Sequence, residues 1–183
     1  AERELRRLFD SGTREGERVE ELRASIIRKR ADEAGPWFEQ ARATLRELCA
    51  HAEPLGIAIG IENRLHYHEI PQPDEAAALL ADYAADVAGY WHDVGHAEVQ
   101  ARLGLVDKRS WLDVNGTRCI GSHLHDVDGI GDHRAPGNGD VEWEYIRDGL
   151  PASALRVFEI NQSQPAEAVA GAIAFLRARG VIA

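Results

Sequence analysis

Residues 119–126 read C-I-G-S-H-L-H-D, and this stretch decides the fold that we expect of the chain. An apolar start leads into two histidines, and a glycine-rich polar segment follows at 129–139. This pattern is typical of a buried strand that ends in a polar loop. Side chains alternate across a strand, so His123 and His125 are expected to face the same way. Two imidazoles on one face favour a metal or an anionic ligand; the alternative is a pair of solvated loop histidines.

Three other short apolar runs also end in polar side chains. They are residues 55–61 before Glu62, 87–92 before Asp93 and 155–160 around Glu159. With the strand expected at 117–124, successive strand ends lie about one βα unit apart in the sequence. In parallel α/β folds, ligands bind at the carboxyl ends of the strands. The four matched placements therefore predict a metal centre, with separate helix caps and loop ion pairs as the alternative.

Helical periodicity dominates the start of the chain and recurs between the strands. We expect residues 1–54 to be helical, with a break at Gly35-Pro36, because Pro36 suits the first turn of a new helix. That helix would bury an apolar stripe made of Trp37, Ala41, Leu45, Leu48 and Cys49. Later helices are expected at 75–86, where Asp74 would be the cap, and at 97–103, 109–114, 142–149 and 165–180.

Composition indicates an ordinary globular protein. Of its 183 residues, 44% are hydrophobic and 28% are charged, which suits one sizeable core. No run approaches the roughly 18 apolar residues of a membrane span. We expect a single cytoplasmic domain with Cys49 and Cys119 as free thiols. Its parts would be a helical region, 1–54, and four βα units, 55–183. The formal net charge of −10 makes a nucleic-acid partner unlikely.

The four strand-end residues define a donor set that is rich in oxygen and has one nitrogen. Such a set suits one divalent ion of manganese, magnesium, cobalt or zinc. A divalent ion can polarise a carbonyl or phosphoryl oxygen. Two carboxylates on opposing strands could remove a proton from the carbon next to a carbonyl and return it, with the metal stabilising the enediolate.

Four motifs give the chain a family resemblance. They are G-I-E-N-R at 60–64, W-H-D-V-G-H-A at 91–97, H-L-H-D-V-D-G-I-G-D-H-R-A-P-G-N-G-D at 123–140 and F-E-I-N-Q at 158–162. Through them the chain, over about residues 37–181, resembles the xylose isomerase-like TIM-barrel superfamily. More narrowly, it is similar to the sugar phosphate isomerase/epimerase group, which is related to the endonuclease IV-type AP endonucleases.

The resemblance implies roles for individual residues. The implied metal ligands are Glu62, Asp93, His123 and Glu159, and Glu62 and Glu159 would double as the acid/base pair. The implied substrate contacts are His96, His125 and His133. The choice between His123 and His125 as the metal ligand stays open at this point. Arg64 and Arg134 are candidate partners for a phosphate or carboxylate on the substrate, or else surface arginines in weak ion pairs.

Two departures from the family pattern shape the expected function. The endonucleases place an acidic ligand two positions before the histidine that corresponds to His133, and this chain has Gly131 there. A full barrel has eight strands, whereas the pattern here predicts four, so we expect the C-terminal part of a (β/α)8 TIM barrel. The chain would then be either a fragment or one half of a barrel that a second chain completes, for which a homo-oligomer is one arrangement.

The resemblance favours a metal-dependent isomerase or epimerase acting on a small sugar or sugar phosphate. One alternative is a phosphodiesterase acting on abasic DNA, which needs a basic groove and further metals. Another is an inactive fragment or a binding module on the same scaffold. The sequence names neither the sugar nor the metal, because loops set specificity in this barrel type.

Overall fold

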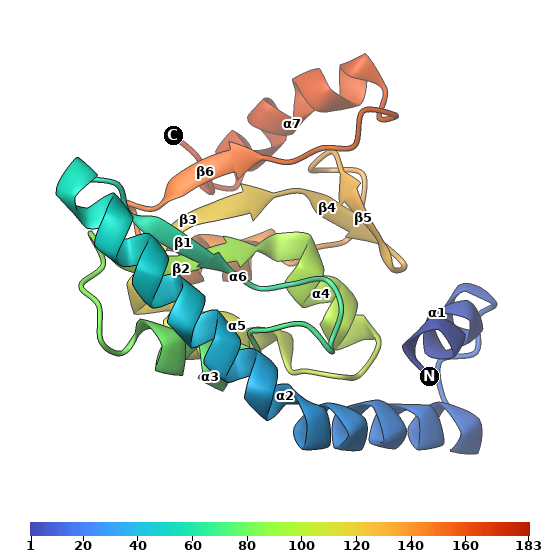
Figure 1. The fold of residues 1–183 in the computed structure, drawn as a ribbon. Helices are drawn as coiled ribbons and strands as arrows, with labels where there is room; N and C mark the ends of the chain where they lie inside the picture. The colour runs from blue at the N-terminus through green and yellow to red at the C-terminus, as the bar shows by residue number, and fades with distance from the viewer.

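The computed structural model describes residues 1–183. Strands and helices alternate along most of the chain after the first two helices (Figure 1). The helices are α1 (Glu2–Asp10), α2 (Glu17–Ala52), α3 (Pro73–Leu80), α4 (Val94–Arg102), α5 (Lys108–Asn115), α6 (Trp143–Gly149) and α7 (Ala166–Ala178), with short 3-10 turns η1 (Glu53–Leu55) and η2 (Gly116–Arg118). The strands are β1 (Ile59–Glu62), β2 (Ala88–Asp93), β3 (Cys119–Leu124), β4 (Asp126–Asp128), β5 (Gly131–Arg134) and β6 (Leu155–Phe158).

Four of these strands form one parallel sheet in the order β1-β2-β3-β6. Parallel neighbours need a crossover, and each crossover here contains a helix, so the chain builds consecutive βα units. The carboxyl ends of all four strands lie at one edge of the sheet (Figure 1). This arrangement confirms the expected part of a TIM barrel.

A second, two-stranded sheet corrects the glycine-rich loop expected at 129–139. Strands β4 and β5 pair antiparallel directly after β3, with Asp126 opposite Arg134. Gly129 has a φ of 63° between the two strands, a conformation that glycine adopts without steric cost. Periodicity could not reveal this hairpin, because β4 and β5 are too short to show an alternating pattern.

The two faces of the main sheet have different surroundings. Tyr90 and Leu124 point to the outer face, where they are fully buried under the helices. Leu155 and Val157 alternate to the inner face of the last strand, where they are 63% and 40% exposed. In a closed barrel that inner face would be covered by the opposing strands.

Helix α2 corrects the expected break at Pro36. The helix runs without interruption from Glu17 to Ala52 with Pro36 inside it, and Figure 1 shows that it changes direction along its length. An internal proline removes one backbone hydrogen bond and kinks a helix, and here the helix bends instead of ending. Leu45 and Cys49 are buried as expected, but Trp37 and Leu48 are 69% and 49% exposed, because no element of this chain packs on that side.

Two further element boundaries differ from those expected. The run 55–61 was expected to be one buried strand, but Leu55 belongs to η1 and Ile57 is exposed, since β1 is an edge strand. Helix α3 begins at Pro73 and ends at Leu80, and its cap is Gln72 instead of Asp74. The Gln72 backbone N–H donates to the Glu75 carboxylate at 2.8 Å, which forms a reciprocal capping box.

One hydrophobic cluster connects the helices with the outer face of the sheet, and it includes Leu5 of α1, Val19 of α2 and Leu176 of α7. The two cysteines, Cys49 and Cys119, are both free and buried. None of the helices combines the length and the apolar composition that crossing a membrane requires.

Candidate metal centre

The four expected metal ligands come from the ends of the four parallel strands. Glu62 closes β1, Asp93 closes β2, His123 lies one residue before the end of β3, and Glu159 follows β6. Strand register places Asp93 directly beside His123. One potential ligand atom from each residue lies within 4.8 Å of those from the other three. The structure therefore brings together side chains that are nearly 100 positions apart in the sequence.

His123 lies at the centre of this group. Its Nδ1 is 2.7 Å from Glu62 Oε1, 2.8 Å from Glu159 Oε2 and 3.5 Å from Asp93 Oδ2. Hydrogen bonding to Asp93, assisted by the charges of Glu159 and Glu62, raises the pKa of His123 to about 9 despite partial burial. A protonated His123 is thus the positive charge that the three carboxylates share in this structure.

Asp93 is the most tightly held of the carboxylates. Burial by itself would raise the pKa of Asp93, but hydrogen bonds from His123 and His125 hold that pKa well below its usual range. The Asp93 side chain also caps α4, since its Oδ1 accepts the backbone N–H of His96 at 2.7 Å. The carboxylate is therefore ionised and fixed in orientation.

Asn63 is a supporting residue that the sequence reasoning missed. Its Nδ2 donates to the Asp93 carbonyl at 2.8 Å, and its Oδ1 accepts the Asp93 backbone N–H at 2.7 Å. The Tyr90 hydroxyl donates to the same Oδ1 at 2.9 Å. Asn63 thereby ties the ends of β1 and β2 together, and its place next to Glu62 in the motif E-N-R was the only available signal.

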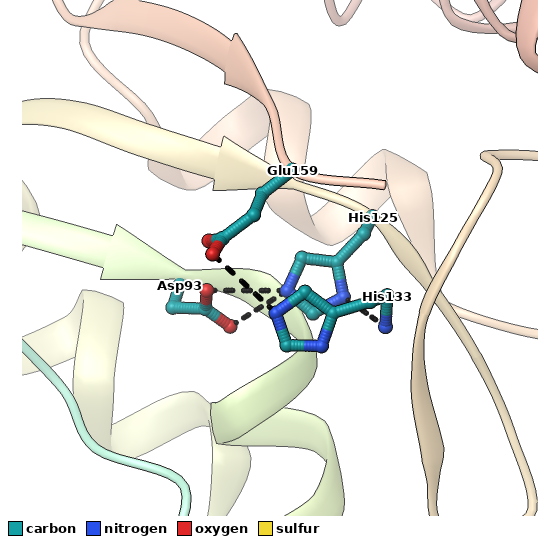
Figure 2. Close-up of side chains that lie close together, drawn as sticks. All are labelled: Asp93, His125, His133 and Glu159. Carbon is teal, nitrogen blue, oxygen red and sulfur yellow. Dashed lines mark hydrogen bonds and ion pairs between the residues drawn. The ribbon is translucent and has the colours of Figure 1, made fainter. Parts of the chain in front are cut away.

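A second group of side chains overlaps the first, as Figure 2 shows. It shares Asp93 and Glu159 and adds His125 and His133, whose rings stack with centroids 4.2 Å apart and planes at 9°. His125 Nε2 lies 3.0 Å from Asp93 Oδ1, and His133 Nε2 lies 3.6 Å from Glu159 Oε1. Unlike His133, His125 is completely buried.

The other residues expected to contact the substrate are His96, Arg64 and Arg134, and the structure places them at different distances from the carboxylates. His96 lies beside the second group, and its Nδ1 donates to the Asn63 carbonyl at 3.0 Å, which leaves Nε2 with a free lone pair. Arg64 reaches Glu62 Oε2 at 2.9 Å and is half exposed at the rim. Arg134 instead pairs with Asp128 of its own hairpin at 3.2 Å, so the structure does not bring it to the carboxylates.

The indole of Trp91, which the sequence reasoning also missed, lies beneath the four expected metal ligands. Trp91 lies on the inner face of β2, and its ring meets the His123 ring edge-on, with centroids 5.2 Å apart. The neighbouring inner positions are glycines: a Cβ on Gly121 would lie 2.2 Å from the Trp91 ring, and one on Gly60 would lie 3.3 Å away. These two glycines make room for the indole directly below the centre.

The donor set fits a hard divalent cation. Three carboxylates and one imidazole supply four ligand atoms, and Glu159 and His123 remain partly accessible. Carboxylate oxygens with a single imidazole are typical ligands of manganese, magnesium, cobalt and zinc. The same three carboxylates raise the pKa of His123 to about 9, which reflects a demand for positive charge at this point.

The fold is that of part of a TIM barrel, with a cluster of acidic and histidine side chains at the carboxyl ends of its strands. The xylose isomerase-like TIM barrel family matches residues 3–179, so the chain belongs to this family. No curated protein matches the chain.

Two solved structures share the fold. The crystal structure of a D-tagatose 3-epimerase-like protein is 19% identical with a TM-score of 0.62, over 81% of this chain and 56% of that one. The apo crystal structure of 3-keto-D-glucoside 4-epimerase from E. coli is 19% identical with a TM-score of 0.57, over 77% of this chain and 53% of that one. The chain thus spans just over half the length of either structure.

Proposed function

We propose that this chain carries the metal centre of a divalent-metal-dependent isomerase or epimerase acting on a sugar or sugar phosphate. The observation that carries the proposal is the convergence of Glu62, Asp93, His123 and Glu159 at four adjacent strand ends. Membership of the family supports it, and so do the names of the two solved structures, both of which refer to sugar epimerases. In this proposal residues 1–183 act as one domain, with the chemistry on the four βα units of 55–183.

The two glutamates supply the proton chemistry. They belong to the two outermost strands of the sheet, and both reach His123, so their carboxylates would flank a small substrate from opposite sides. One carboxylate takes the proton from the carbon next to the substrate carbonyl, and the other returns it. A divalent cation held by the four residues would polarise that carbonyl.

Two more side chains are placed to orient the substrate. His96 presents a free Nε2 lone pair, which can accept a hydrogen bond from a sugar hydroxyl. Arg64 is half exposed beside Glu62 and can donate to a substrate hydroxyl or phosphate oxygen. Both residues come from the loops that follow β1 and β2, where ligands of α/β barrels bind.

Metal binding and proton exchange test the proposal. Titration of the 183-residue chain with Mn²⁺ should show one site, which Glu159→Gln weakens and the exposed-helix control Glu47→Gln leaves unchanged. With Mn²⁺ or Co²⁺ in D₂O, a polypeptide that includes these residues and completes the barrel should exchange a substrate C–H proton, as seen by NMR. Absence of exchange with every ketose, ketose phosphate and inosose tested would refute the proposed reaction.

The overlapping second group favours one competing function. A phosphodiesterase acting on abasic DNA needs more than one metal, and Asp93, His125, His133 and Glu159 lie close enough to suggest a further site. The net charge of −10 opposes DNA binding. Incubation with abasic-site DNA and Zn²⁺, together with a metal count per chain, decides between the two. One metal and no nicking would exclude the nuclease.

A further inference from the structure

His125 has both ring nitrogens engaged and no exposed surface. The backbone N–H of His133 donates to His125 Nδ1 at 2.8 Å. On the other side of the ring, His125 Nε2 lies 3.0 Å from Asp93 Oδ1 and 3.1 Å from Asp93 Oδ2. Figure 2 shows the ring between the Asp93 carboxylate and the His133 backbone.

These contacts fix the tautomer of His125. A backbone N–H can only donate, so Nδ1 must hold a lone pair. The single ring proton of the neutral imidazole is therefore on Nε2, where it points at the Asp93 carboxylate. A cation at Nε2 would have to displace this proton and leave a costly imidazolate. His125 in this arrangement is thus a hydrogen-bond donor to Asp93 and not a metal ligand.

Two neighbouring residues hold the ring in place. The His133 ring stacks on it, and His133 has a φ of 56°, an unusual value for a residue other than glycine, at the point where its N–H meets Nδ1. The ring also lies close to Gly95 of α4, where a Cβ would lie 2.1 Å from His125 Cε1. Helix α4 and the β4–β5 hairpin therefore confine the plane of the imidazole, and the hydrogen bonds at Nδ1 and Nε2 set which way it faces.

We propose that His125 is a positioning residue, which transmits the placement of the β4–β5 hairpin to the Asp93 carboxylate. This proposal rests on the proposed function, because Asp93 is one of the proposed metal ligands. His125 fixes the rotation of the carboxylate, so that one oxygen remains directed at His123 while both accept from the Nε2–H group. This role replaces the substrate contact expected from the sequence, since the buried ring offers a substrate no surface.

Matched variants of the 183-residue chain test the role. His125→Phe keeps an aromatic ring but cannot donate, and it should weaken Mn²⁺ binding by about tenfold to a hundredfold, the usual effect of losing a group that orients a ligand. His125→Gln can place an amide N–H near the Nε2 position and should stay within about threefold of the wild type, since the donor to Asp93 is kept. Unchanged affinity in His125→Phe, or equal losses in both folded variants, would overturn the proposal.

The tautomer gives a second readout that needs no variant, and its first measurement is made on the metal-free chain. Long-range ¹H–¹⁵N NMR of the histidine rings reports which nitrogen is protonated, and His125 should carry its proton on Nε2 both before and after Mg²⁺ or Zn²⁺ is added. A proton on Nδ1, or loss of the Nε2 proton on adding the cation, would overturn the role. If the wild type binds no divalent cation, the proposed function fails, whereas the tautomer still tests His125 independently.

Discussion

At the residue scale, His123 is the side chain on which the proposed centre depends most directly. It is the one nitrogen donor among the four proposed ligands, and all three carboxylates approach its Nδ1. The consequences of this position can be measured for metal binding and for pH dependence separately.

Removal of the imidazole should abolish tight metal binding. His123→Gln keeps a polar side chain but cannot place a nitrogen lone pair at the Nδ1 position, so we expect Mn²⁺ affinity to fall on the order of a hundredfold, about 2.8 kcal/mol. Isothermal titration of this variant and of the control Glu47→Gln, which alters an exposed residue of α2, measures the loss. Wild-type affinity in His123→Gln would exclude His123 as a ligand.

The raised pKa of His123 predicts how the metal-free chain responds to pH. That pKa rises from 6.5 to about 9, chiefly through the hydrogen bond with Asp93. A group with a raised folded-state pKa stabilises the folded state fully below its unfolded pKa, and that stabilisation is lost as the pH rises through the folded-state value. The urea midpoint should therefore fall between pH 6.5 and about 9. His123→Gln should lose this part of the pH dependence, and a variant with the wild-type profile would show that another group causes it.

At the scale of elements, the close approach of β2 and β3 depends on Gly121. A methyl group there would lie 2.2 Å from the Trp91 ring, which also borders His123. Gly121→Ala should lower the free energy of unfolding by about 1–3 kcal/mol through overpacking and should weaken Mn²⁺ binding as the indole shifts. The matched control is Gly171→Ala in α7, where no atom lies within 4 Å and alanine should stabilise the helix by about 0.5–1 kcal/mol.

A double variant tests whether Gly121→Ala lowers stability through the steric contact with the Trp91 ring. Trp91→Leu removes the ring that the new methyl group would meet, so the double variant should be more stable than the sum of the two single changes predicts. Urea unfolding of the four proteins supplies the coupling free energy. Strict additivity would mean that Gly121 and Trp91 do not interact as the structure indicates.

At the scale of the whole molecule, the inner face of the half-barrel exposes apolar side chains beside open sheet edges. Leu155 and Val157 are exposed there, and both edges of the parallel sheet lack a neighbouring strand. Open edges beside apolar surface promote association. We expect the 183-residue chain to associate with increasing concentration in sedimentation experiments. Leu155→Lys should reduce this association, whereas Val114→Lys, at an exposed apolar site on α5, should not.

Local pattern alone was enough to predict the four parallel strands and the residues at their ends. Each strand coincides with a short, mostly apolar run that ends near a polar side chain, so the sequence places Glu62, Asp93, His123 and Glu159 at equivalent positions of successive βα units. Because such strands share one direction, their carboxyl ends meet at one edge, and no tertiary information was needed to expect a cluster there.

Other features depended on contacts between segments that are distant in the sequence. Pro36 bends α2 without ending it, and Trp37 is exposed, because burial depends on which elements pack beside the helix. The β4–β5 hairpin is too short for a periodic signal, and its pairing alone brings the His133 N–H to His125.

The two histidines of residues 119–126 show most clearly which properties follow from the sequence and which follow from the tertiary structure. The sequence by itself determined that His123 and His125 stand at a strand end near the other polar residues, because that follows from the local alternation of side chains. Only the tertiary structure decided how they differ. His123 faces three carboxylates in a partly open site, whereas His125 is enclosed by α4 and the hairpin, and their hydrogen bonds and Gly95 fix its proton and its orientation.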